Sequence, residues 1–331
     1  MMNLLNNMSL IPKNFIVANI VDTLKEDPET GAEKVFEMGD KFVKDPETIA
    51  LLQQVKDTYY TQPAIRMYAK NLIYNTDKKC LNHFIQNIVV KALIEGISKR
   101  EQLSQKYRIK VPHAFVLNLG REQLNEVELL VGQARDLGIH AIILTNDDEQ
   151  FFKIYEKYSD VQFLVLTTST ALTMERCLAL TRVSNVVPMI IFDGKAGQVG
   201  PSLGYLKASG LLYGIVTPTN QHNWREVTAD PYILPLIRQG SRLNWYVTSA
   251  TDQFNPQELV LLKQQLESIR KMRPYIPLHL EVDTPISHSM ISGTFTLTEQ
   301  VNQKMYQISF PEVNFENSRG KNLIQIFKAH I

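Results

Sequence analysis

Side chains that could do chemistry gather where the sequence predicts that strands end. A predicted strand at 139–145 is followed directly by Asn146, Asp147 and Asp148. Clustered carboxylates of this kind can hold a divalent cation. They can equally cap the next helix, and we favour that interpretation because acidic residues in a first turn complement the helix dipole.

Two further predicted strand ends carry polar residues. Asp193 opens the loop Asp-Gly-Lys-Ala-Gly, whose glycines would let backbone amides approach a phosphate. This loop does not match the phosphate-binding P-loop pattern, so an ordinary loop is the favoured interpretation. Glu281 and Asp283 end the last predicted strand, and His288 follows. A carboxylate near an imidazole can act as an acid–base pair or bind a metal.

Other catalytic signatures are weak. The zinc-protease pattern H-E-x-x-H and the dinucleotide-binding pattern G-x-G-x-x-G do not occur. No lysine lies within a predicted strand, so a Schiff-base aldolase has no obvious nucleophile. His113 and His140 lie at predicted strand starts, away from these loops, and we interpret them as structural. We therefore predict no metal site and no bound cofactor.

These residues depend on a fold that changes character at residue 111. From there, apolar runs alternate with amphipathic helices, which is typical of parallel strand–helix–strand units. Several runs are almost continuously apolar, as strands buried on both faces are. A barrel and an open doubly wound sheet both fit this pattern. The predicted strands lie near 113–118, 139–145, 161–168, 186–193, 212–219, 242–249 and 276–282.

The flanking regions differ from this central part. Residues 1–108 are predicted to be an N-terminal helical region, in which the helix start Asp-Pro-Glu-Thr occurs at 27–30 and again at 45–48. Asp as the N-cap, with Pro at the first helical position, favours a helix. We assign 109–283 to the α/β part. Residues 284–331 form a C-terminal extension with a short extended piece at 305–310 and a final helix.

The composition bounds the partners and the location. The 331 residues carry a net charge of +1, so no global field favours nucleic acid or an anionic membrane. Cys80 and Cys177 form no C-x-x-C pair, which suits a reducing compartment. No apolar run approaches the ~20 residues of a membrane span, and the first residues do not resemble a signal peptide. We expect a soluble cytoplasmic protein that binds neither nucleic acid nor a membrane.

From about residue 45 to the end, the chain resembles the radical S-adenosylmethionine (SAM) enzymes. The resemblance rests on PAIRMYAKNLIY at 63–74, YEKYSDVQFLVLTTSTAL at 155–172, NVVPMIIFDG at 185–194 and YGIVTPTNQHNWREVT at 213–228. It implies an α/β fold with a partial TIM barrel. In that fold a (βα)6-like parallel sheet has an N-terminal helical region before it and a short C-terminal extension after it.

The cofactor-binding motifs of that family have no counterpart here. The family holds a [4Fe–4S] cluster on a C-x3-C-x2-C loop after the first strand. In this chain Asn118 leads through Arg121 into a predicted helix without a cysteine. The glycine-rich turn that receives SAM corresponds to 146–149, where both glycines are replaced. The arginine expected soon after the fourth strand is also missing.

Two main hypotheses follow from these departures. The first is a radical-SAM-like pseudoenzyme without an iron–sulfur cluster, which acts as a binding or scaffold protein for a peptide or for a partner enzyme such as an active radical SAM enzyme. The second is an enzyme that uses the barrel pocket for acid–base or metal-dependent chemistry. An ordinary barrel enzyme unrelated to that family remains a third alternative. The candidate pocket residues are Asn118, Arg121, Asn146, Asp147, Asp148, Asp193, Glu281, Asp283 and His288.

Overall fold

The computed structural model describes most of the chain, and its first part is helical. The described residues are 13–42, 46–119, 124–145, 149–192, 196–252, 254–283, 293–301 and 304–329. The N-terminal helices are α2 (Lys13–Glu26), α3 (Pro28–Phe42), α4 (Pro46–Thr61), α5 (Pro63–Asn75), α6 (Lys78–Phe84), the π-helix η1 (Ile85–Glu95) and α7 (Gly96–Tyr107). None of the described helices combines the length and apolar character that a membrane span requires.

The predicted helix start at Asp27 is present as a capped helix, and a second helix start is capped by Asn255. Asp27 accepts hydrogen bonds from the Glu29 backbone N–H at 3.0 Å and from the Thr30 hydroxyl at 2.6 Å. Asn255 caps α14 (Pro256–Met272) by accepting from the Gln257 N–H at 2.9 Å. These side chains satisfy backbone N–H groups that a first helical turn leaves unpaired. Asp45, the predicted second Asp cap, lies outside the described residues.

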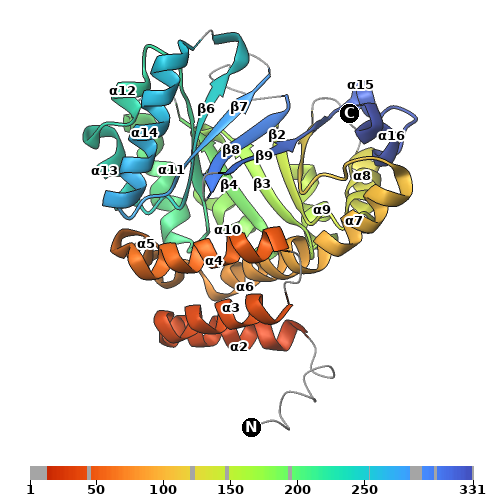
Figure 1. Cartoon of the computed structure of the whole chain (residues 1–331), viewed down its shortest axis with the longest axis horizontal. Helices are drawn as coiled ribbons and strands as arrows, with labels where there is room; N and C mark the ends of the chain where they lie inside the picture. Colours follow the sequence, from red (N-terminus) through yellow and green to blue (C-terminus); the bar gives the residue numbers. More distant parts are fainter. Residues whose placement is uncertain are drawn as a thin grey trace.

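The described strands form one sheet. In sequence order they are β1 (Phe115–Asn118), β2 (Ala141–Thr145), β3 (Gln162–Thr167), β4 (Val186–Ile191), β5 (Gly214–Pro218), β6 (Leu243–Ser249), β7 (Pro277–Val282), β8 (Phe295–Val301), β9 (Lys304–Phe310) and β10 (Glu312–Val313). Neighbouring strands from β1 to β7 are parallel, and β8 and β9 continue the sheet as an antiparallel hairpin. The strands curve round into the barrel seen in Figure 1.

The sheet closes through its last segment. Only Pro311 separates β9 from β10, and β10 pairs in parallel with β1, with Val116 opposite Glu312. Residues 304–313 therefore pair with β8 at one end and with β1 at the other. The predicted barrel-like α/β fold is confirmed. The C-terminal extension contributes β8, β9 and β10 to this sheet. Of these strands, β8 and β10 were not predicted.

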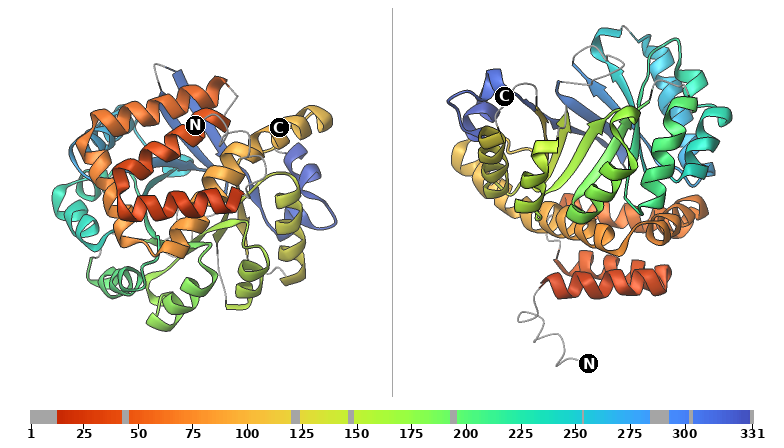
Figure 2. Two further views of the ribbon diagram at one scale, coloured as in Figure 1. Left: turned by 90° about the horizontal axis from the view of Figure 1, so that it is seen from below. Right: turned by 180° about the vertical axis from the view of Figure 1, so that it is seen from behind.

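Helices cover the outside of the barrel. Between and after the strands lie α8 (Leu124–Asp136), α9 (Phe152–Lys157), α10 (Met174–Val183), α11 (Ala196–Ala208), α12 (Trp224–Val227), α13 (Asp230–Gln239), α14, α15 (Phe315–Ser318) and α16 (Leu323–Ala329). Figure 2 shows the N-terminal helices lying across one end of the barrel.

Alternation along the strands produces two apolar layers. Phe115 and Leu117 belong to the cluster between the strands and the helices, whereas Val116 belongs to the cluster inside the barrel. Other members of the inner cluster are Ile143, Leu166, Met189, Val216, Trp245, Leu280 and Phe295. Because successive strand residues face opposite sides, these inner residues share one face of the sheet. The described strands fill the middle of the barrel with apolar side chains.

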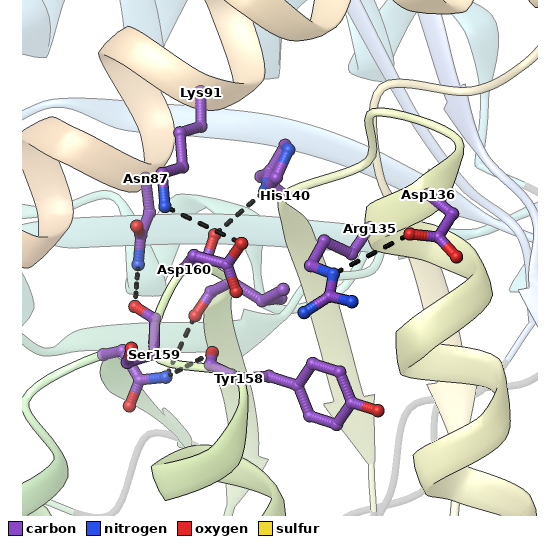
Figure 3. A network of polar contacts seen from close by, with 10 residues as sticks. Asn87, Lys91, Arg135, Asp136, His140, Tyr158, Ser159 and Asp160 are labelled. Carbon is purple, nitrogen blue, oxygen red and sulfur yellow. Dashed lines mark hydrogen bonds and ion pairs between the residues drawn. The ribbon is translucent and has the colours of Figure 1, made fainter. Parts of the chain in front are cut away.

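The strand-start end of the barrel is held by polar contacts with η1. Figure 3 shows Asn87 and Lys91 of η1 facing the turn before β3. Asn87 donates to the Ser159 carbonyl at 3.0 Å, and Lys91 lies 3.7 Å from the Asp160 carboxylate. The His140 Nδ1 atom lies 2.9 Å from the Asp160 carbonyl. These contacts dock the helical region on the barrel, in keeping with a structural role for His140.

Candidate functional site

Parallel strands bring their carboxyl ends to one rim of the barrel, where active sites of this architecture lie. Of the predicted pocket residues, Asn118, Glu281 and Asp283 are described at or near this rim. The other predicted residues, Arg121, Asn146, Asp147, Asp148, Asp193 and His288, lie outside the described residues. Their membership of a pocket stays a prediction.

Asn118 is held by the C-terminal extension. Its side-chain amide donates to the Glu312 carboxylate at 2.9 Å, and the Asn314 amide lies 3.5 Å from the same oxygen. Immediately after Asn118, the Leu119 N–H donates to the Thr145 carbonyl at 3.2 Å, which prolongs the pairing of β1 with β2. Leu119 is buried among the residues between sheet and helices. Glu312 was not predicted as a rim residue, because its contact with Asn118 spans 194 positions.

The two carboxylates at the end of β7 have different surroundings. Leu280 and Val282 belong to the inner cluster, so Glu281 faces the outside of the barrel. There its carboxylate lies 3.9 Å from the Lys263 ammonium group on α14. Asp283 is exposed and lines a groove described below. The structure therefore does not bring Glu281 together with Asn118.

One polar atom at the rim is buried without a partner among the described residues. The Thr145 hydroxyl, at the end of β2 and opposite Asn118 in the strand register, forms no hydrogen bond there. Thr145 is only 1% exposed. A buried hydroxyl without a partner loses free energy, so this position favours a polar contact that the described residues do not supply.

The cysteines do not fit an iron–sulfur site. Cys80 lies on α6 and Cys177 on α10, and both are buried. Burial raises the pKa of the Cys80 thiol to about 12 and that of the Cys177 thiol to about 11. A [4Fe–4S] cluster needs several thiolates gathered around one position, whereas these two cysteines lie on separate helices. The chain has no third cysteine. In the described part of the chain, no group of three His, Cys, Asp or Glu side chains could hold a metal ion.

A serine in α11 fits the sequence pattern of a hydrolase but not its geometry. Residues 200–204, Gly-Pro-Ser-Leu-Gly, match G-x-S-x-G. In serine hydrolases this motif forms an exposed turn between a strand and a helix. Ser202 instead lies inside α11, is 4% exposed, and donates to the Ser169 carbonyl at 2.7 Å. It is a buried helix residue without the exposure of a nucleophile.

A groove outside the rim offers more space. A cavity of about 900 Å³ lies between the segment from α7 to β1 and the outer face of β8 and β9. Its floor and walls include Ile109 and Phe327, which are 6% and 2% exposed. It is lined by Ser104, Arg108, Ile109, Lys110, Pro112, His113, Asp283, Thr294, Thr296, Gln307, Ile308, Ser309, Pro311 and Phe327. We call this cavity the seam groove.

The charges of the seam groove are uneven. Arg108 and Lys110 are exposed, and neither forms an ion pair with another described residue. The Arg100 guanidinium donates to His113 Nδ1 at 2.8 Å. Partial desolvation of the ring, with the charges of Arg100 and Lys110, lowers the pKa of His113 to about 4, so its imidazole is neutral near pH 7. The positive charge of the groove therefore comes from Arg108 and Lys110.

Two smaller cavities lie elsewhere on the barrel. One of about 260 Å³ separates α11 from α13, where the Phe192 and Tyr232 rings stack at 5.1 Å. The other, of about 630 Å³, lies between α4 and α14 and includes His279. Both are formed by helix side chains for the most part, and neither contains a predicted pocket residue.

Comparisons with known proteins give no identity. No protein-family model matches the chain, and no curated protein matches it. Among solved structures, Streptococcus suis SuiB bound to S-adenosylmethionine matches at 9% identity with a TM-score of 0.44, covering 66% of this chain and 64% of SuiB. SuiB bound to its precursor peptide SuiA matches at 8% identity and a TM-score of 0.41, covering 67% of this chain and 69% of SuiB.

A 4-hydroxy-2-oxoglutarate aldolase also matches, at 12% identity and a TM-score of 0.32, over 52% of this chain and 73% of the aldolase. The chain thus spans 64% of the length of the SAM-bound SuiB chain. At these identities and TM-scores the likenesses carry no argument about function.

Proposed function

We propose that this chain is a non-catalytic binding protein built on a radical-SAM-like barrel, and that it takes a peptide segment of a partner. The observation that supports this proposal best is the state of its cysteines. Both thiols are buried in helices, and burial holds their pKa values near 12 and 11. Two buried thiols on separate helices do not make up the three-thiolate ligand set of a [4Fe–4S] cluster in that family.

The first turn after β1 supports the same proposal. In the related family a cluster-binding loop leaves the first strand, whereas here Leu119 still pairs with β2 and is buried. Asn118 is engaged by Glu312 at 2.9 Å. At Asn118 and Leu119, the last described residues before α8, the chain's own contacts occupy the end of β1.

A peptide suits the space that the described residues leave. The seam groove lies between the segment that joins α7 to β1 and the strands β8 and β9, and it has a volume of about 900 Å³. Ligand cavities of this size lie at the upper end of the range for small molecules. Hydroxyl and amide side chains line it together with two cations, which is a suitable lining for a polar chain.

Anaerobic treatment with iron and sulfide tests the non-catalytic part of the proposal. We expect far less than one cluster per chain and no formation of 5′-deoxyadenosine from SAM. A C80A/C177A double variant is the matched control, because adventitious iron should bind equally to both proteins. Stoichiometric cluster in the native chain, lost in that variant and accompanied by SAM cleavage, would overturn the proposal.

A second candidate function rests on the Thr145 hydroxyl, which is buried without a partner among the described residues. It lies just before the predicted acidic residues at 147 and 148, so an enzyme using a metal or acid–base chemistry at this rim is the alternative. Titration with Mg²⁺, Ca²⁺ or Mn²⁺ would test it. A cation that binds the native chain but not a D147A/D148A variant supports this alternative.

A further inference from the structure

The barrel closes on β1 through only a short stretch. The Val116 N–H donates to the Pro311 carbonyl at 2.9 Å, and Leu117 lies opposite Val313. Before Pro311 in the sequence, from residue 304 to residue 310, β9 pairs with β8 alone among the described strands. β9 is therefore an edge strand over most of its length, although it belongs to a nearly closed barrel.

The open edge of β9 carries backbone groups in a known direction. The Pro311 carbonyl points toward β1, because it accepts the Val116 N–H. Peptide groups along a strand alternate between its two edges, so Ser309 and Gln307 direct their N–H and C=O groups to the same side. Among the described residues, no backbone group pairs with them on this side. Both residues are exposed.

Two prolines explain why this seam stays open. If the β1–β10 ladder continued toward lower residue numbers in the same register, Ala114 would lie opposite Phe310 and Pro112 opposite Ile308. Residue 311 would then donate to the Ala114 carbonyl, and residue 112 would donate to the Gln307 carbonyl. Proline has no backbone N–H, so neither bond can form. The ladder stops at Val116, and the seam groove lies below it.

The segment opposite β9 is held apart from it by its own contacts. The Ile109 N–H donates to the Ser104 carbonyl at 3.1 Å, and the Val111 N–H donates to the Ser104 hydroxyl at 3.0 Å. Arg108 at the end of α7 adopts a left-handed conformation with φ 54°. These contacts fix the segment at the end of α7. The cavity of about 900 Å³ is therefore lined by this segment on one side and by β8 and β9 on the other.

We propose that an extended peptide segment binds in the seam groove as an added strand on the edge of β9, with an acidic side chain facing Arg108 and Lys110. This inference rests on the proposed peptide-binding function and names its mode. Strand addition supplies affinity through main-chain hydrogen bonds and specificity through side-chain contacts. Gln307 and Ser309 supply the main-chain donors and acceptors.

Charge complementarity selects the occupant. Arg108 and Lys110 are exposed at the end of the groove nearest α7. Asp283 lines the groove beyond β7, so a segment that is acidic along its whole length fits poorly. A peptide with one or two acidic residues toward the α7 end meets both conditions. A second copy of this chain, pairing edge to edge through β9, is the competing occupant.

The test begins with a probe of known composition. A phage-displayed library of random linear 12-residue peptides is panned against the immobilised full chain, and enriched peptides are synthesised and titrated by fluorescence anisotropy. We expect an enriched Asp or Glu and at least tenfold weaker binding to K110E. The control K153E reverses an exposed lysine of α9, a helix that contributes no lining residue to the groove, and should bind normally.

Backbone pairing is tested from both sides. Gln307→Pro removes one N–H from the open edge and should weaken binding at least tenfold. Two sets of synthetic peptides are compared, one N-methylated at odd-numbered residues and the other at even-numbered residues. One set should bind weakly and the other normally, because a strand presents only alternate amides to one edge. This second measurement does not alter the protein, so it decides the matter even if Gln307→Pro folds poorly.

The outcomes separate the mode from the function. If peptides bind, but neither Gln307→Pro nor N-methylation of the peptide weakens that binding, strand addition is overturned and the proposed peptide-binding function stands. A library that yields no binder would overturn both. A concentration-dependent dimer of the free chain that Gln307→Pro abolishes would assign the edge to a second copy and overturn the proposed occupant.

Discussion

The two edges of β1 differ, and the difference shows how this barrel combines stability with an opening. On one edge all four residues of β1 pair with β2, from Phe115 opposite Ile142 to Asn118 opposite Thr145. On the other edge only Val116 and Leu117 pair with β10. Both edges belong to the same buried strand, so burial of its side chains does not cause the difference. The difference comes from the backbone N–H donors that Pro112 and Pro311 lack beside the open edge.

The neighbours of β1 also differ in composition. β2 reads Ala-Ile-Ile-Leu-Thr and is buried at every position. β9 reads Lys-Met-Tyr-Gln-Ile-Ser-Phe, in which exposed Gln307 and Ser309 alternate with less exposed residues. A strand of the first kind needs cover on both faces, whereas one of the second kind tolerates water on one face. The paired edge of β1 stabilises the fold, and the open edge leaves room for a ligand.

The largest expected effect comes from proline scanning of β9. Ile308 lies opposite Leu297 of β8, and its N–H points toward that strand, whereas the Gln307 N–H points to the open seam. We expect Ile308→Pro to lower the free energy of unfolding by about 3 kcal/mol, because proline removes a ladder bond there. Gln307→Pro should cost less than about 1 kcal/mol, since edge positions facing solvent accept proline.

Urea denaturation followed by circular dichroism measures both changes. Equal losses for the two variants would mean that the Gln307 N–H already has a partner and that the edge is not open.

Much of the paired part of the sheet could be predicted from the sequence. Long apolar runs identified the strands from β1 to β7, since runs buried on both faces leave few alternatives. The caps at Asp27 and Asn255 followed from residue type alone. These features are local, so they need no knowledge of distant contacts.

The seam and the rim could not be predicted in the same way. β8 lies in a stretch from residue 284 that is rich in Ser, Thr and Gly, and its alternation of threonines with apolar residues is too short to identify a strand against that background. The bond between Asn118 and Glu312 joins positions 194 apart. Pro112 and Pro311 gave a usable signal, because each forbids a ladder bond, but its meaning requires the register of β1 against β10. The pattern G-x-S-x-G at 200–204 shows the converse, a motif whose buried helical setting removes its chemical meaning.

The paired part of the sheet should also respond to pH. His279 on β7 is 5% exposed, and burial lowers its pKa to about 3. Its pKa in the unfolded chain is about 6.5, so below pH 6.5 the unfolded state binds a proton that the folded state excludes. Stability contributed by this group is therefore complete above pH 6.5 and falls as the pH decreases toward 3.

The expected loss is at most about 1.4 kcal/mol per pH unit between pH 6 and pH 4. His279→Gln keeps a polar partner for the Thr248 hydroxyl, which lies 3.0 Å from His279 Nε2, and removes the titration. Urea midpoints measured from pH 4 to pH 8 should fall less steeply for this variant than for the native chain. Parallel curves would show that His279 is protonated equally in both states.

The smallest change in stability comes from replacing Pro112 and Pro311 with residues that have a backbone N–H. This change also tests most directly why the two edges of β1 differ. In a P112A/P311A variant, residue 311 can donate to the Ala114 carbonyl and residue 112 to the Gln307 carbonyl, so the ladder can extend below Val116. Each new hydrogen bond adds about 1 kcal/mol, and each proline lost costs about 0.4 to 1 kcal/mol through the unfolded state. The net stability should change by less than about 1 kcal/mol.

Hydrogen exchange of single amides reports the closure itself. The Ala114 and Ser309 amides should exchange quickly in the native chain and at least tenfold more slowly in P112A/P311A, while peptide binding to the seam groove weakens. Pro63→Ala at the start of α5 is the matched control, because it removes a proline without touching the seam. If Ala114 and Ser309 exchange as fast in P112A/P311A as in the native chain, the contacts of Ser104 with 109 and 111 hold the seam open without help from the prolines.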